Sequence, residues 1–294
     1  MSTHVSNIIS FNEPLKKFVF EQIHLDITRN ATDDFNLFHD KKKWHNITNN
    51  PFNGPIMLGF QLEALVEDQV KKIRSKENIS PNKLAYSNYQ FNFAGAIKPG
   101  EPFELTVKKT RQDTNNISNR ICIKSKKRLV ISGLKKDTSK PLYLATADFS
   151  TLKDFSSFED KSLVLEGRYF LKKKYITTSN AKNYLTGSLV EQSDYIDEID
   201  DKVNFPEMFP CSFISCALLE KARLEGLDFS KNPSVYTQHK ISINKKLIGN
   251  IKSNDPLYIL IQNEPFKKTT DLNCFGLNQA NEIIFRSIIS LSEI

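Results

Sequence analysis

The sequence has few cysteines and no long hydrophobic run. Its four cysteines are Cys122, Cys211, Cys216 and Cys274. None belongs to a C-x-x-C array or has zinc-ligand spacing, which argues against a disulfide framework and a structural metal site. No stretch approaches the roughly 18 consecutive apolar residues of a membrane-spanning helix, and residues 1–17 lack the basic start and apolar run of a signal peptide. We therefore expect a cytoplasmic protein with reduced thiols, no membrane partner and no cofactor.

Charge of one sign is not concentrated in the chain either. The 41 basic and 34 acidic residues give a net charge of +7, which suits a partner carrying phosphates or carboxylates and also serves solubility alone. The sequence has no basic-aromatic module of the RNA-binding kind, so we expect no nucleic-acid partner. Hydrophobic residues make up 39% of the chain and charged residues 26%, a balance that supports a packed core.

The first half of the chain predicts one long helix followed by strands. Residues 18–27 alternate as a strand does, and residues 56–73 repeat apolar side chains at intervals of three and four, as a helix does. Pro55 suits a helix start, where its missing N–H is not needed, and Pro81 closes the segment. Extended runs separated by turn residues then follow at residues 84–93, 103–109, 120–131 and 142–152.

The second half repeats this order. It is predicted to have an opening strand at residues 167–178, a helix at 213–224, and strands at 235–243, 257–262, 271–277 and 282–291. Because one helix cupped by an antiparallel sheet is an α+β layer arrangement, two such units can join edge to edge and remove two exposed sheet edges. We predict this pseudo-dimer as the fold.

A pair of similar segments supports an internal duplication. AIKPGEPFELTV (residues 96–107) aligns with NIKSNDPLYILI (residues 250–261), so that Lys98 matches Lys252 and Pro102 matches Pro256, each pair 154 positions apart. We therefore expect three parts, which are an N-terminal unit at residues 1–152, a linker at 153–165 and a C-terminal unit at 166–294.

The segment TDDFNLFH, residues 32–39, is the candidate for chemistry. Asp34 and His39, with ordinary side-chain pKa values of about 3.9 and 6.5, can hold one water between them and exchange protons near neutral pH. The amide of Asn36 can orient that water or brace the loop. A D-x-N-x-x-H loop on its own is also typical of an Asx-turn with a surface His, and this alternative stays open.

Two segments together resemble the MaoC-like, (R)-specific enoyl-thioester hydratase and dehydratase family of hotdog folds. Its motif runs D-x-N-P-x-H, then Gly-Pro-Ile, then a Gly near the start of the central helix. The matching positions are Asp34, Asn36, His39, Gly54, Pro55, Ile56 and Gly59. The resemblance covers residues 19–107 by motif, and the second half matches by architecture only. It implies a double hotdog, in which a catalytic N-terminal unit is joined to a degenerate C-terminal one.

The resemblance implies hydration of trans-2-enoyl thioesters or dehydration of (R)-3-hydroxyacyl thioesters, carried on CoA or an acyl carrier protein, in fatty-acid or polyketide assembly. Asp34 would draw on the water, and His39 would position it and share the proton. The expected substrate-binding residues are Asn36, Gly54, Ile56, Met57, Leu58 and Gly59. Backbone N–H groups at residues 57–59 would receive the charge that develops on the thioester oxygen. Lys41 to Lys43 could attract the phosphates of CoA or an acidic carrier.

Several departures keep alternatives open. Leu37 stands where the family has Pro, so the loop loses a fixed φ, and Leu58 stands where many members carry His. Residues 188–193, at the repeat offset from the motif, carry no equivalent of it, so we expect a second half that shapes an acyl tunnel. An idle acyl-binding or scaffold partner of a dehydratase is one alternative, and a hotdog thioesterase using Glu63 is another. The chain is expected to be a monomeric pseudo-dimer or a homodimer. We expect no role for the remaining histidines, which include His239.

Overall fold

The computed structural model describes residues 16–80, 84–143, 147, 149 and 155–294. The strands before residue 150 are β1 (Lys16–Val19), β2 (Tyr86–Phe93), β3 (Pro102–Val107), β4 (Arg111–Gln112), β5 (Asn116–Ser125) and β6 (Arg128–Thr138). The later strands are β7 (Ser162–Val164), β8 (Tyr169–Ile176), β9 (Ile196–Asp197), β10 (Lys202–Val203), β11 (Ser234–Asn244), β12 (Asp255–Gln262), β13 (Thr269–Leu277) and β14 (Ile283–Glu293). The helices are α1 (Gln22–Thr32), α2 (Gly59–Lys76), α3 (Thr178–Gly187), α4 (Met208–Ser212), α5 (Ile214–Leu224) and α6 (Lys245–Gly249).

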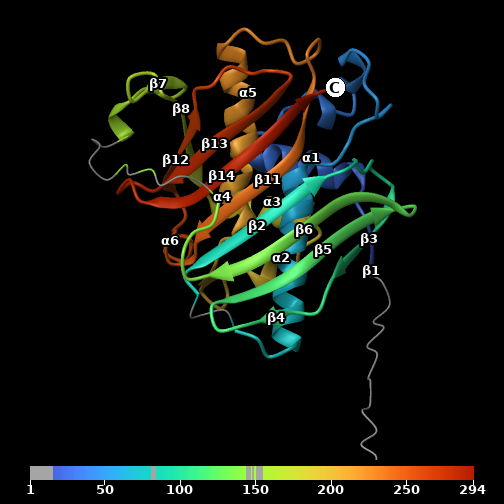
Figure 1. Ribbon diagram of the computed structural model, residues 1–294, viewed down its shortest axis with the longest axis vertical. Coiled ribbons are helices and arrows are strands. Elements are labelled where there is room, and N and C mark those ends of the chain that lie inside the picture. The colour runs from blue at the N-terminus through green and yellow to red at the C-terminus, as the bar shows by residue number, and fades with distance from the viewer. Residues whose placement is uncertain (1–15, 81–83, 144–146, 148, 150–154) are drawn as a thin grey trace, which may run out of the picture.

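One large antiparallel sheet dominates the described part of the chain (Figure 1). Its strands follow the order β1-β3-β5-β6-β2-β11-β14-β13-β12-β8-β7, with β4 paired to β5. Strands β2 and β11 join the two halves, with Tyr89 opposite Ile241 and Phe91 opposite His239. The predicted edge-to-edge joining of two antiparallel α+β units is therefore confirmed.

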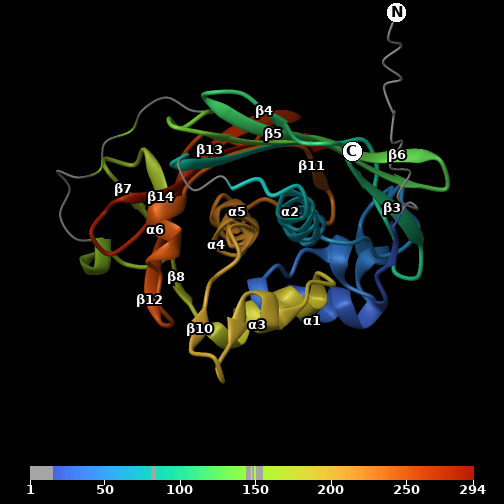
Figure 2. The same ribbon diagram turned by 90° about the horizontal axis from the view of Figure 1, so that it is seen from below.

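Helices cover one face of this sheet in two layers (Figure 2). The long helices α2 and α5 lie next to the sheet, and α1 and α3 lie on their far side. Because α2 is enclosed in this way, it buries Leu65, Val66 and Val70 together with polar residues such as Glu63 and Glu67. The helix begins at Gly59, so the prediction that it starts near Pro55 is wrong. Residue 81, expected to close this segment, lies outside the described residues.

Equivalent turns confirm the duplication. Gly100 and Asn254, 154 positions apart, precede β3 and β12 and both have a positive φ, 77° and 74°. Gly100 donates its N–H to the Phe20 carbonyl at 2.7 Å, and Asn254 donates its N–H to the Ile176 carbonyl at 2.6 Å. Each turn therefore binds the backbone at the end of its unit's opening strand, just after β1 in the first half and at the last residue of β8 in the second.

The strand predicted at residues 18–27 is largely wrong. Only Lys16–Val19 is extended, and α1 begins at Gln22 because Glu21 and His24 form a reciprocal capping box. Within α1 the buried side chains include Leu25, Thr28 and Ala31, a helical spacing. Helix α3 was not predicted at all.

Two further strand predictions need correction. The single strand expected at residues 120–131 is a hairpin, since Lys126 and Lys127 adopt positive φ values of 48° and 67° between β5 and β6. The strand expected at 142–152 falls mostly outside the described residues, and those that are described belong to no strand. Within the expected linker, β7 pairs with β8 at the sheet edge. The division into domains stays a prediction.

Candidate active site

The loop after α1 is held by its own side chains. Asp33 ends the helix in the left-handed conformation, φ 53°, and residues Leu37–His39 form one turn of 3-10 helix. The Asn36 side chain accepts the N–H of Phe38 at 3.1 Å, and Asp34 Oδ1 accepts the N–H of Asn36 at 3.3 Å. The loop thus contains the Asx-turns that the sequence allows, and Asn36 braces it.

Asp34 and His39 face each other inside this loop. Nε2 of His39 lies 3.8 Å from Oδ2 of Asp34, and both side chains are buried. Nδ1 of His39 lies 2.8 Å from the carbonyl oxygen of Ile56, and because a carbonyl can only accept, Nδ1 carries the proton and leaves the Nε2 lone pair directed at Asp34. A separation of 3.8 Å is too long for a direct hydrogen bond, and it suits a shared water or substrate oxygen.

The protonation of His39 follows from its surroundings. Burial lowers the pKa of His39 below its ordinary value, and the nearby Arg29 cation acts in the same direction. The Asp34 carboxylate and the hydrogen bond to Ile56 oppose this shift without overcoming it. His39 is therefore a neutral imidazole at pH 7, ready to accept a proton at Nε2.

A cavity of about 250 Å³ opens beside this pair. Its walls come from the motif loop, the start of α2, the end of β2 and the start of β11. The lining residues are Asp34, Asn36, Phe38, His39, Phe52, Ile56, Met57, Gly59, Leu62, Phe93, Ala94, Gly95, Ala96, Ile97, Ser234, Val235, Tyr236 and Thr237. Most of these walls are apolar, and the titratable side chains among them are those of Asp34, His39 and Tyr236.

The amino end of α2 meets this cavity. A Cβ at Gly59 would lie 3.2 Å from the Phe93 ring and 3.5 Å from the Tyr236 ring, so the glycine lets these two rings approach the helix. No side chain caps this helix end, and the first-turn amides from Gly59 onward have no carbonyl of a preceding turn to bind. The N–H of Met57 donates to the Ile97 carbonyl at 2.8 Å, so it cannot serve as the charge-stabilising donor expected there.

The structure brings together most of the predicted substrate-binding residues, but two stand apart. Asn36, Ile56, Met57 and Gly59 line the cavity. Gly54 instead packs against the Lys98 side chain, 3.7 Å from where a Cβ would lie, and Leu58 is buried as the residue preceding α2. Neither lines the cavity, and the roles assigned to all these residues stay predictions.

The sequence led us to expect that the second half shapes an acyl tunnel, but it identified none of the residues by which that half reaches the cavity. Residues 234–237 of β11 line the cavity because β11 pairs with β2, whose far end reaches the helix start. Burial, and then the charge of Asp34, raise the pKa of Tyr236 well above its ordinary value. The phenol is therefore neutral. In the sequence, the only signal that Tyr236 belongs to the site was an aromatic residue at the start of a predicted strand.

The carboxylate proposed for a thioesterase is engaged elsewhere. Glu63 Oε1 lies 2.9 Å from Nδ1 of His239, and Nε2 of His239 lies 2.7 Å from the Ser287 hydroxyl. All three side chains are buried and none lines the cavity. His239 is consequently a buried residue of strand β11 that links α2, β11 and β14, and the expectation that it has no functional role stays a prediction.

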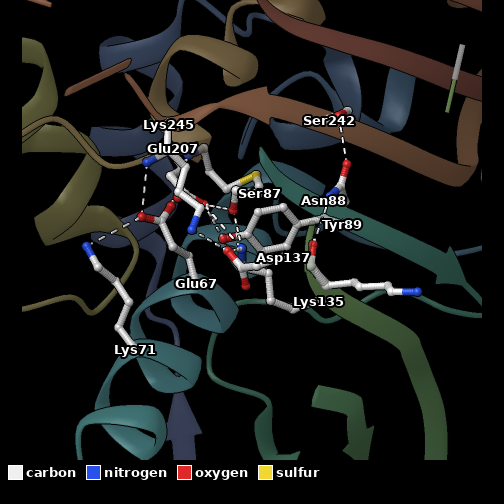
Figure 3. A network of polar contacts seen from close by, with 12 residues as sticks. Glu67, Lys71, Ser87, Asn88, Tyr89, Lys135, Asp137, Glu207, Ser242 and Lys245 are labelled. Carbon is white, nitrogen blue, oxygen red and sulfur yellow. Dashed lines mark hydrogen bonds and ion pairs between the residues drawn. The ribbon is translucent and has the colours of Figure 1, made fainter. Parts of the chain in front are cut away.

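The opposite end of the β2–β11 seam is filled by charged side chains (Figure 3). Glu207, just before α4, accepts hydrogen bonds from Ser87 and from Tyr89, the latter at 2.6 Å. Lys135 contacts Ser87 and lies 3.8 Å from Glu207. Glu67 accepts the N–H of Glu207 at 3.0 Å. A helix therefore starts near each end of the seam between β2 and β11. The start of α2 meets the cavity at one end, and the start of α4 lies among carboxylates and a lysine at the other.

Two kinds of feature are missing from the described part of the chain. No helix there is long and apolar enough to cross a bilayer. No cluster of three or more His, Cys, Asp or Glu side chains there has an arrangement that could hold a metal ion.

Comparison with known proteins rests on structure alone. No protein-family model matches the sequence, and no curated protein matches it. The fold is similar to a putative MaoC domain protein dehydratase from Chloroflexus aurantiacus J-10-fl, with a TM-score of 0.60 and 7% identity over 95% of this chain and 93% of that one. It is also similar to a conserved hypothetical protein with a double hotdog fold from Mycobacterium tuberculosis, with a TM-score of 0.56 and 10% identity over 96% and 95% of the two chains.

A third similar structure belongs to a differently named enzyme. It is an acyl-CoA thioesterase II from Mycobacterium marinum, with a TM-score of 0.51 and 8% identity over 82% of this chain and 91% of that one. Identities this low establish the architecture and not the reaction. The chain therefore has the double-hotdog fold, and MaoC-like dehydratases are among the proteins whose structures it resembles.

Proposed function

We propose that this protein is an acyl-thioester enzyme that hydrates trans-2-enoyl thioesters to (R)-3-hydroxyacyl thioesters, or catalyses the reverse dehydration. One observation carries the proposal, which is that Asp34 and the free Nε2 of His39 lie 3.8 Å apart in a mostly apolar cavity that also receives the amino end of α2. An apolar wall suits an acyl chain, and the paired base groups suit a water.

The protonation state of His39 constrains the proton transfers. A neutral His39 and the Asp34 carboxylate hold no proton that they can donate to substrate, since Nδ1–H is bound to the Ile56 carbonyl. The pair accepts a proton from water while the water oxygen bonds to C3, and the C2–C3 double bond electrons move toward the thioester. The same pair then returns the proton to C2, so that one water is added in all. The pair acts as a unit, and dehydration reverses these steps.

The charge that moves to the thioester oxygen needs donors. First-turn amides of α2 and the positive end of its dipole lie at the cavity, and preorganised donors of this kind typically lower a barrier by about 3 kcal/mol each. The motif loop would supply proton transfer, and the helix start would supply charge stabilisation. Lys41 to Lys43, two residues past His39, would favour the phosphates of CoA or an acidic carrier.

The test is turnover of a defined thioester by the purified full-length chain. Loss of ultraviolet absorbance from crotonyl-CoA or a carrier-bound enoyl group, with chiral analysis of the product as the (R)-alcohol, supports the proposal. Thiol release without hydration would identify a thioesterase instead. Binding of enoyl thioesters without any turnover would identify an acyl-binding or scaffold subunit and overturn the enzymatic proposal.

A further inference from the structure

Tyr236 forms a wall of the cavity that comes from the second half of the chain. Its ring lies edge-on to Phe60 of α2, with centroids 6.1 Å apart, and 6.5 Å from the ring of Phe93 on β2. Gly59 lies against the same ring. The phenol therefore stands at the amino end of α2, where the proposed reaction takes place.

The hydroxyl of Tyr236 is directed at helix α5 of the second half. It shares a hydrogen bond with the hydroxyl of Ser215, which lies in the first turn of α5. Ser215 is itself buried, and its neighbours Ile214 and Cys216 belong to the hydrophobic core. The Tyr236 side chain consequently spans from the cavity to the core of the second half.

The backbone holds Tyr236 in this place. The pairing of β11 with β14 shifts register between Tyr236 and Gln238, and the hydroxyl of Thr237 donates to the Ser290 carbonyl at 3.2 Å. This bulge lies at the end of β11 whose residues 234–237 all line the cavity. The tyrosine is thus fixed by the strand at one end and by α5 at the other.

We propose that Tyr236 determines the acyl-chain length, closing the pocket toward the second half so that short acyl groups are preferred. The inference rests on the proposed function. The cavity of about 250 Å³ lies below the range of roughly 300 to 1,000 Å³ that is usual for pockets holding larger ligands. The second half therefore closes the acyl site, whereas the sequence led us to expect an acyl tunnel there. Tyr236 is the side chain that closes it, and a smaller residue at this position would open the site.

The experiment compares kcat/KM for butenoyl-, octenoyl- and dodecenoyl-CoA in the wild type and in Tyr236→Ala and Tyr236→Phe. The wild type should prefer butenoyl-CoA. Tyr236→Ala should raise the dodecenoyl to butenoyl ratio by at least about tenfold, the gain from burying roughly two more methylene groups. Tyr236→Phe keeps the ring and should keep the wild-type ratio. Tyr175→Ala removes a tyrosine that is 61% exposed on β8 and serves as the matched control.

Two results would overturn the inference. One is a wild type that uses dodecenoyl-CoA as well as butenoyl-CoA, and the other is a folded Tyr236→Ala variant with an unchanged ratio. If Tyr236→Ala does not fold, Tyr236→Leu replaces it, with the same criterion. If the wild type turns over no enoyl thioester, the proposed function fails separately, and calorimetric binding of butyryl- and dodecanoyl-CoA then decides the length preference. Absence of any binding would remove the length proposal too.

Discussion

Nε2 of His39 faces Oδ2 of Asp34 across 3.8 Å because the other ring nitrogen is held by the Ile56 carbonyl. The segment Ile56 to Gly59 leads directly into α2, so the backbone that orients the imidazole also places the helix start. This one short stretch of chain therefore links the imidazole, with its fixed tautomer, to the helix amino end.

Removing either proton-transfer group should remove turnover. We expect Asp34→Asn and His39→Ala each to lower kcat by at least about a hundredfold, the low end for general acid–base groups. The Asn oxygen can still accept the Asn36 N–H that Asp34 accepts now, so the loop should keep its shape. The measurement is the initial rate of enoyl-thioester hydration, with circular dichroism to verify folding.

The neighbouring Asp33 gives a matched control for that substitution. Asp33 contacts Lys174 outside the cavity, so Asp33→Asn should leave kcat within about twofold of wild type, as for a surface ion pair. Equal rates in wild type, Asp34→Asn and His39→Ala would show that the pair has no part in the reaction.

Activity and stability should both decline in acid because of His39. Burial keeps the pKa of His39 below its usual value of about 6.5, so the unfolded chain binds more protons than the folded one once the pH falls below 6.5. Stability from this group is therefore complete above that value and is lost as pH falls toward the folded-state pKa. Hydration by the neutral imidazole should fall only at the lower end of this range, where pH approaches the folded-state pKa of His39.

Urea denaturation at several pH values measures this effect as the difference between wild type and His39→Gln. The wild type should lose more stability than the variant between neutral pH and pH 5. A parallel pH dependence in the two proteins would show that His39 titrates normally in the folded state.

The sequence predicted the parts of this molecule that depend on local periodicity and on the duplication. The long helix, predicted at residues 56–73 and found at 59–76, most strands and the edge-to-edge joining followed from helical spacing, alternation and the 154-residue offset. Helix α1 was misread because Phe18, Phe20, Ile23 and Leu25 alternate over the strand and the helix start alike, although Ile23 is 58% exposed. Local alternation cannot reveal a capping box that redirects the chain.

The candidate site likewise has one part that local sequence predicts and another that it does not. Asp34 and His39 share one loop, so their meeting was predictable from a spacing of five residues. Tyr236 reaches them only through the pairing of β2 with β11, and the contact of Glu63 with His239 crosses the same seam. Long-range pairing of this kind leaves no local signal in a single sequence.

The Glu63–His239 pair should matter for stability. His239→Ala leaves the buried carboxyl group of Glu63 without its ring partner and should destabilise the protein by about 1–3 kcal/mol. Ser287→Ala removes one hydrogen bond to the same ring and should cost about 1 kcal/mol. Urea denaturation measures both changes. If the wild type released free thiol and Glu63→Gln abolished that release without lowering stability, Glu63 would be a catalytic group and the thioesterase alternative would return.

Glu67 should give a pH dependence of the opposite sign. Burial, reinforced by the neighbouring charge of Glu207, raises the pKa of Glu67 to about 7, although Lys71 and the amides of Glu207 and Met208 favour the ionised form. Between the ordinary carboxyl value of about 4.5 and pH 7 the folded chain binds more protons than the unfolded one. Stability from this group is therefore complete below about 4.5 and declines as pH rises to 7.

The Glu67→Gln variant isolates this contribution. Its amide can accept only one of the two backbone N–H groups that Glu67 accepts at 3.0 Å, so the variant should be less stable at every pH by about 1–3 kcal/mol. Its deficit relative to wild type should shrink as pH rises from 5 to 7, since only the wild type loses a proton there. Glu159→Gln, at an exposed position, should show no such trend. A deficit that stays constant across this range would mean that Glu67 is ionised throughout and that the network at this end of the seam does not retain its proton.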